Sequence, residues 1–179
     1  MNDWNLIVTI YQEGLRRALR FLRHIGPTER SRYYNVLVMK ADDPLAVLGA
    51  IERLTEERPA LYDAIARVAP AMRSFDFQSP EAFKADATSI LLAWAPNLAG
   101  RSFHVRLHRR GPKLDLRTPD VERFLGEAVI DATKKAGTAA RISFSDPDAL
   151  IVIDTVDDRA GLAVWTREDL ARHRLLRPD

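Results

Sequence analysis

The chain has 179 residues, of which 46% are apolar, and carries 27 basic and 25 acidic side chains. This length suits one compact domain or two small ones, and the apolar content excludes a globally disordered chain. The lack of cysteine excludes disulfides, thiolate metal sites and cysteine nucleophiles. No apolar run reaches the roughly 18 residues of a membrane span, and the first residues lack the pattern of a signal peptide. We therefore expect a soluble cytoplasmic protein with no membrane partner.

Apolar periodicity in residues 1–72 predicts an α+β domain. Asp43 is expected to cap a helix that begins at Pro44. Pro59 is expected to open a shorter helix that ends near Pro70. The expected strands cover 5–11 and 33–40, and the expected helices cover 13–25, 43–57 and 59–70. This order is typical of part of a ferredoxin-like unit, so we assign residues 1–72 to a ferredoxin-like N-terminal domain.

Residues 73–179 are expected to form a second α+β domain. Ser79 and Pro80 begin a helix that should end near Trp94, before Pro96. The composition of Asp157-Asp158 is that of a hairpin turn. Further expected strands cover 71–77, 102–108, 140–144, 149–156 and 162–166, with helices over 118–136 and from 168 onward.

Positive charge is concentrated in one segment. The first hundred residues carry 12 basic and 12 acidic side chains, whereas residues 101–117 carry six basic and one acidic, a net charge of +5. In the strand, Phe103, Val105 and Leu107 alternate with His104, Arg106 and His108, which predicts one buried face and one basic outer face. Such a cluster attracts phosphates. The candidate RNA-binding residues are Arg101, His104, Arg106, His108, Arg109, Arg110, Lys113 and Arg117.

Three motifs resemble those of the THUMP family of RNA-binding domains. They are the strand and basic turn of 102–111, the helix start Val121-Glu122-Arg123-Phe124-Leu125-Gly126, and the segment 142–153, in which Asp146-Pro147-Asp148 precedes a strand. The resemblance implies a THUMP domain over 73–179 that binds tRNA at its acceptor end. The two-part organisation looks most like the small stand-alone branch that assists tRNA cytidine acetylation. It implies tRNA and a tRNA-modifying enzyme as partners.

The sequence offers no candidate for catalysis. There is no Walker-type loop and no G-x-G-x-x-G after a strand. His104 and His108 share a strand face, but about 13 Å separates them, so one metal ion cannot bind both. We expect no enzyme activity, no cofactor and no metal. Two alternatives stay open: a non-catalytic subunit of a split tRNA methyltransferase or thiolation enzyme, and an α+β interaction module without RNA binding.

Two further groups of residues remain ambiguous. Core packing is expected for Trp94, Phe103, Phe124 and Phe144, whereas Tyr33, Tyr34 and Trp165 are candidates for exposure. Arg16, Arg17, Arg20 and Arg23 lie opposite the apolar face of the helix 13–25. Such a face is usually only solvated, but it could also extend an RNA-binding surface.

Overall fold

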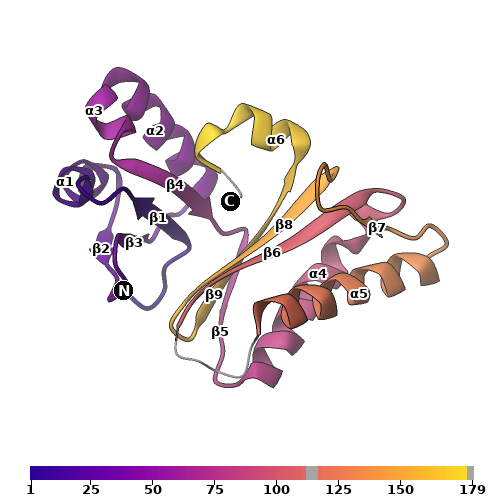
Figure 1. Cartoon of the computed structure of the whole chain (residues 1–179). Helices are drawn as coiled ribbons and strands as arrows, with labels where there is room; N and C mark the ends of the chain where they lie inside the picture. Colours follow the sequence, from indigo (N-terminus) through magenta and orange to yellow (C-terminus); the bar gives the residue numbers. More distant parts are fainter. Residues whose placement is uncertain (112–116, 177–179) are drawn as a thin grey trace. The chain divides into compact units, whose positions relative to one another are not determined.

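The computed structural model describes residues 1–111 and 117–176 (Figure 1). The chain divides into two compact units, one of residues 1–72 together with 170–176 and one of residues 73–169. The sequence prediction had placed 170–176 in the second domain, whereas the structure packs this segment on the first unit. Leu175 and Leu176 are buried there, and Glu52 accepts a hydrogen bond from the backbone N–H of Leu175 at 3.3 Å.

The first unit has the ferredoxin-like order of elements that the sequence predicts. Its four-stranded sheet has the order β2-β3-β1-β4, and every neighbouring pair is antiparallel. The elements are β1 (Leu6–Ile10), α1 (Leu15–Ile25), β2 (Thr28–Arg30), β3 (Val36–Met39), α2 (Pro44–Glu57), α3 (Pro59–Tyr62) and β4 (Ile65–Pro70).

Local chemistry explains where α2 begins, but the sequence prediction for the next segment is wrong. The Asp43 carboxylate accepts hydrogen bonds from the N–H groups of Leu45 at 3.0 Å and Ala46 at 3.1 Å, as expected of an N-cap.

The helix expected over 59–70 ends at Tyr62, and Ile65–Pro70 is strand β4. The β-branched residues of this segment favour a strand, and pairing with β1 completes the sheet. The short strand β2 was also not predicted.

The second unit is built around a mixed five-stranded sheet of order β5-β9-β8-β6-β7. Strand β6 is parallel to β7 and β8, whereas β8 and β9 form an antiparallel hairpin and β5 pairs antiparallel with β9. The elements are β5 (Arg73–Asp76), α4 (Pro80–Leu98), β6 (Ser102–Arg110), α5 (Thr118–Lys135), β7 (Arg141–Ile142), β8 (Ala149–Val156), β9 (Arg159–Thr166), α6 (Arg167–Arg172) and the 3₁₀ helix η1 (Arg174–Leu176), which ends in the first unit.

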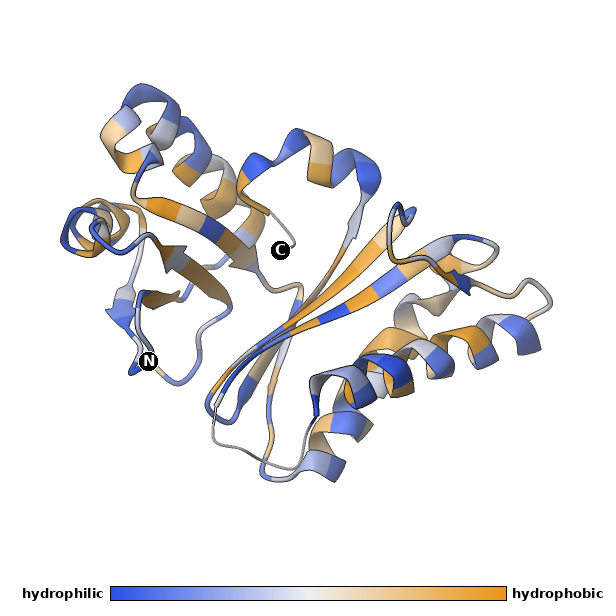
Figure 2. Cartoon of the chain, viewed as in Figure 1, coloured by the Kyte–Doolittle hydropathy of each residue, from blue (hydrophilic) through white to orange (hydrophobic). Residues whose placement is uncertain are grey.

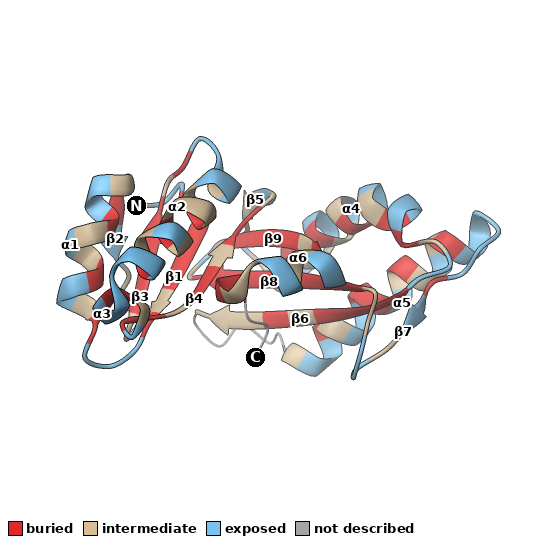
Figure 3. Ribbon diagram, turned by 90° about the horizontal axis from the view of Figure 1, so that it is seen from above, coloured by how far each residue is buried: buried red, intermediate tan, exposed pale blue. Residues whose placement is uncertain are grey.

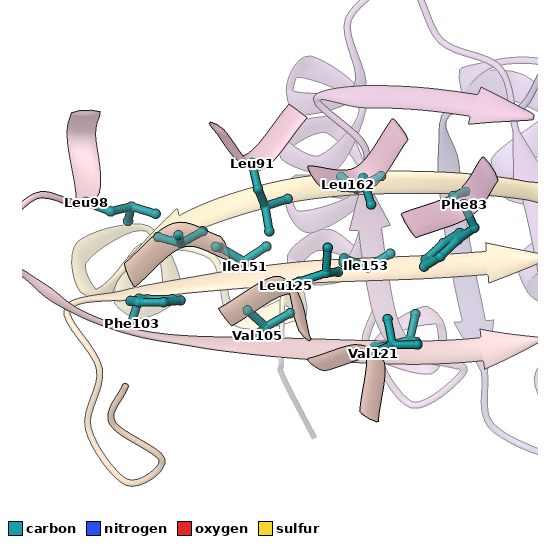
Figure 4. Close-up of a cluster of buried hydrophobic side chains, with 14 of the residues drawn as sticks. Phe83, Leu91, Leu98, Phe103, Val105, Val121, Leu125, Ile151, Ile153 and Leu162 are labelled. Carbon is teal, nitrogen blue, oxygen red and sulfur yellow. The ribbon is translucent and has the colours of Figure 1, made fainter. Parts of the chain in front are cut away.

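The core of the second unit lies between its sheet and the helices α4 and α5 (Figure 1). Hydrophobic residues concentrate in the strands, as Figure 2 shows, and β8 is buried along its whole length (Figure 3). Phe103 and Val105 of β6 point into this core, where they meet Leu125 of α5 and Leu91 of α4 (Figure 4). The alternation in β6 thus buries the predicted apolar face in the core. His104, Arg106 and His108 point to the opposite face of the sheet.

Several predicted boundaries in this unit differ from the structure, and β9 begins at Arg159, three residues before the predicted start. Helix α4 continues through Pro96, an exposed position, and ends at Leu98. Strand β7 has two residues, because the chain leaves the sheet after Ser143, whose N–H donates to the Phe103 carbonyl at 2.9 Å. The hairpin turn at Asp157-Asp158 is as predicted, with Asp157 at a φ of 56°.

Candidate nucleic-acid interface

The candidate residues on β6 differ in how far they are exposed. Arg101 is exposed immediately before the strand, Arg106 and His108 are half-buried, and His104 is buried at 8% exposure. The expectation of an open basic face is therefore wrong at His104. The exposed ring of Phe144 packs edge-on against its imidazole, with 5.0 Å between ring centroids.

The surroundings of His104 favour its neutral form. Burial lowers the pKa of His104 below the ordinary value of 6.5, and the positive charge of Arg106 lowers it further, with Glu122 opposing them. Half-buried Arg106 has an Nε atom that is shielded from solvent and has no hydrogen-bond partner among the described residues. Polar groups of this kind usually find a partner, so Arg106 is a candidate for binding a ligand oxygen.

The remaining candidates fall into different environments. A side-chain nitrogen of Arg110 lies 3.0 Å from the carboxylate of Asp154 on the neighbouring strand β8. This ion pair joins β6 to β8. Arg109 is half-buried. Arg117 is exposed at the start of α5, 3.8 Å from Asp120. Lys113 lies outside the described residues.

A pocket of about 260 Å³ opens beside β6, between the first turns of α5 and the segment that follows β7. It is lined by His104 and Val105 of β6, Pro119, Glu122 and Arg123 of α5, and Ile142 and Phe144. Phe144 is 79% exposed, which is unusual for a large apolar ring. We call this feature the β6–α5 pocket.

Two contacts set the shape of the β6–α5 pocket. Glu122 Oε1 accepts a hydrogen bond from the backbone N–H of Leu107 at 2.8 Å, which ties α5 to β6. Gly126 lets Ile142 lie close to α5, because a Cβ at position 126 would stand 3.2 Å from Ile142 Cδ1. A larger residue there would displace Ile142 from the pocket wall.

The pocket also lies along an edge of the sheet. Strand β7 pairs only with Ser102 and Phe103 of β6. The carbonyls of Arg101 and Phe103 accept hydrogen bonds from this side, so by alternation the backbone N–H and C=O of Val105 point to the same edge. The pocket therefore combines an aromatic ring, a neutral imidazole, a guanidinium at Arg123 and backbone hydrogen-bonding groups.

Sequence reasoning missed Arg123 and Phe144 as site residues. The expected core positions of Phe144 and Phe124 are wrong, since they are 79% and 43% exposed, and Trp165, a candidate for exposure, is buried. One signal could have identified Phe144: it lies three residues before Pro147, which cannot donate to a strand ladder, so its segment was a poor candidate for a strand.

The Asp146-Pro147-Asp148 segment has a structural role. One carboxylate oxygen of Asp148 accepts hydrogen bonds from the Ser102 N–H at 2.9 Å and the Ser102 hydroxyl at 2.8 Å. These two bonds lower the pKa of Asp148 below its usual value. Arg167 pairs with both Asp146 and Asp148, at 3.1 and 3.3 Å. The segment thus joins the starts of β6 and β8 to the end of β9.

The part of the chain that the structure describes contains neither a cluster of metal ligands nor a membrane-spanning helix. Residues 1–111 and 117–176 contain no group of three or more His, Asp or Glu side chains placed to hold a metal ion. Over the same residues, no helix combines the length and apolar character required to cross a bilayer.

Comparison with known proteins gives a family and a fold. The family model described as THUMP domain matches residues 62–164. No curated protein matched the chain.

Solved structures with the same fold include PH1313 from Pyrococcus horikoshii Ot3, at 15% identity and a TM-score of 0.60, over 89% of this chain and 53% of that one. They also include TrmN from Thermus thermophilus, at 20% identity and a TM-score of 0.55, over 89% of this chain and 44% of that one. A 4-thiouridine synthetase in complex with RNA and ATP is similar at 12% identity and a TM-score of 0.58, over 89% of this chain and 40% of that one. The chain thus spans about half or less of the length of these proteins.

Proposed function

Because the chain belongs to the THUMP domain family, we propose that it binds tRNA without catalysing a reaction on it and presents the tRNA to a separate modification enzyme. The β6–α5 pocket carries this proposal. Its exposed Phe144 ring suits stacking with an unpaired base, and nearby cationic side chains suit the phosphates that flank such a base.

Each group of the pocket has a distinct part in this proposal. Neutral His104 offers a ring edge and a hydrogen bond but no charge. Arg123 lines the pocket, and Arg106 lies outside its lining but close enough for its charge to act on His104. Both supply guanidinium groups, which bind phosphate oxygens through two parallel hydrogen bonds. The expected RNA-binding residues Arg101 and Arg109 lie near the two ends of β6 and Arg117 precedes α5, so they add positive charge beyond the pocket, whereas Arg110 is placed to stabilise the sheet through Asp154.

The partner enzyme is a separate part of the proposal. The resemblance to the small adaptor branch favours a tRNA cytidine acetyltransferase. The names of two structural neighbours, a 4-thiouridine synthetase and a possible methylase from Clostridium difficile 630, favour a second candidate, a catalytic protein that methylates or thiolates tRNA. Affinity purification of the tagged chain from its own cells separates them, because the catalytic protein that is recovered would be identified by mass spectrometry.

A direct binding assay tests the RNA part of the proposal. The protein should shift total tRNA at low salt, and the affinity should fall steeply as salt rises. Phe144→Ala should weaken binding about tenfold, since stacking on an aromatic side chain contributes roughly 1–3 kcal/mol per base. Tyr34→Ala removes an aromatic ring that is 73% exposed in the first unit and serves as the control. No shift by the unmodified protein would refute the proposal, and equal effects of the two variants would exclude stacking on Phe144.

A further inference from the structure

Helix α1 of the first unit exposes a face made of arginines. Ala18 and Leu22 are buried against the unit, whereas Arg16, Arg17, Arg20 and Arg23 are exposed. Arg16, Arg20 and Arg23 form one stripe, because residues three and four positions apart are neighbours on a helix. We call the four side chains the α1 arginine face.

This face is not neutralised within the described part of the chain. Arg17 donates a hydrogen bond to the carbonyl of Ala60 at 2.9 Å. Arg16, Arg20 and Arg23 form no ion pair with any residue in 1–111 or 117–176. Helix α1 itself contains no acidic residue. Four positive charges therefore face solvent together.

In contrast to α1, helix α5 has an acidic residue beside its arginines. There Asp120 lies 3.8 Å from Arg117 and 3.5 Å from Arg123, so opposite charges alternate along the surface. Like charges spaced three or four residues apart destabilise a helix. In α1 the guanidinium groups of Arg16 and Arg20, and those of Arg20 and Arg23, repel each other, and no carboxylate within the helix offsets this repulsion. An anionic partner would relieve it.

The structure favours a phosphate polymer over a lipid surface as this partner. A helix that binds a bilayer inserts its apolar side chains into the interface. Ala18 and Leu22 on the apolar side of α1 are buried inside the unit, and the exposed side chains are the four arginines and His24. Arginine matches phosphate oxygens through two parallel hydrogen bonds. From Arg16 to Arg23 the stripe runs about 10 Å along the helix axis, which is long enough to contact more than one phosphate.

We propose that the α1 arginine face binds the phosphate backbone of tRNA, as a second contact in addition to the β6–α5 pocket. This inference rests on the proposed tRNA-binding function and assigns an RNA contact to the first unit. The contact would be independent of nucleotide sequence, because phosphates are common to all tRNAs. It would add affinity and salt dependence without adding base selectivity.

The test is a triple variant, Arg16→Gln with Arg20→Gln and Arg23→Gln, in the full chain. Fluorescence anisotropy with labelled tRNA at several salt concentrations should show a loss of affinity of about tenfold or more at low salt. The slope of log affinity against log salt should fall by about two to three, near 0.7–0.9 for each phosphate contact removed. The control, Arg53→Gln with Lys134→Gln and Lys135→Gln, removes the same charge from exposed positions on α2 and α5. It should change affinity less than threefold and leave the slope unchanged.

Several outcomes would overturn the inference, and they are distinguishable. Equal losses in the two triple variants would show a general effect of net charge. Normal tRNA binding by the α1 variant, with binding by the unmodified chain intact, would refute this inference alone. No tRNA binding by the unmodified chain would refute the proposed function together with it. Loss of binding to phosphatidylserine vesicles, with tRNA affinity unchanged, would assign the face to a membrane. Thermal unfolding of the α1 variant should occur at the same or a higher temperature, because repulsion has been removed.

Discussion

At the scale of single residues, Arg110 shows how a basic side chain in a segment predicted to bind RNA can stabilise the fold. Its partner Asp154 is 4% exposed, so removal of the guanidinium leaves a carboxylate buried without this ion pair. Arg110→Gln should lower the free energy of unfolding by about 2 kcal/mol, measured by urea denaturation. Arg101→Gln, at an exposed position immediately before β6, is the control and should cost less than about 1 kcal/mol. Equal costs would contradict a structural role specific to Arg110.

His104 makes the stability of the protein depend on pH. Its pKa is lowered in the folded state, first by burial and then by Arg106. On the acid side of 6.5, the unfolded state therefore binds more protons than the folded state, and stability is lost as pH falls through this range. The free energy of unfolding should decrease more between pH 7 and pH 5 in the unmodified protein than in His104→Gln. Parallel pH profiles of the two proteins would contradict this expectation.

At the scale of secondary-structure elements, the position of β7 depends on Gly126. A side chain at this position in α5 would meet Ile142 of β7. Gly126→Val should destabilise the protein by about 1–3 kcal/mol through overpacking and weaken tRNA binding by displacing the wall of the β6–α5 pocket. Gly49→Val in α2 is the matched control. It makes the same change in helix propensity, but the added side chain contacts only the flexible end of Arg53. Urea denaturation and anisotropy measure the two effects, and equal destabilisation would exclude crowding against Ile142.

Elements with strong local signals were predictable from the sequence. Asp43-Pro44 marked the start of α2, and the alternation from Phe103 to His108 identified β6 and its buried face. The strand β4 was mistaken for a helix, because its six residues, two of them alanine, are too few to show a clear apolar period. Its strand conformation depends on pairing with β1. The predicted THUMP match and α+β class were correct because they rest on motifs spread over three elements.

The candidate site was less predictable than the fold. Charge counting identified the segment 101–117 but could not distinguish Arg110, which pairs with Asp154 from a strand 44 residues later. Phe144 and Arg123 come together with His104 only through the fold, since they lie on three different segments. The RNA-binding roles of the eight candidate residues stay predictions for the binding experiments.

At the scale of the whole molecule, the segment 170–176 belongs to the first unit although it follows the second in sequence. Leu175 is 1% exposed and lies beside Ile65 of β4 at a small pocket. Leu175→Ala should lower the free energy of unfolding of the first unit by about 3 kcal/mol. Hydrogen exchange should then accelerate in β4 while β8 keeps its protection. Leu92→Ala, at a position that is 42% exposed, is the control, and equal acceleration in β4 and β8 would contradict separate cores.

The return of this segment also sets an order of events during synthesis on the ribosome. The second unit has all five of its strands and the helices α4 and α5 once residue 169 has been made, whereas the first unit still lacks Leu175 and Leu176. Domains generally fold as units while the chain is being made, with the N-terminal one first. Here the N-terminal sheet must instead wait with an uncovered apolar patch while 73–169 emerge. The nascent chain is therefore most exposed to aggregation and chaperone binding at its first unit, and that exposure ends only when residues 170–176 have emerged from the ribosome.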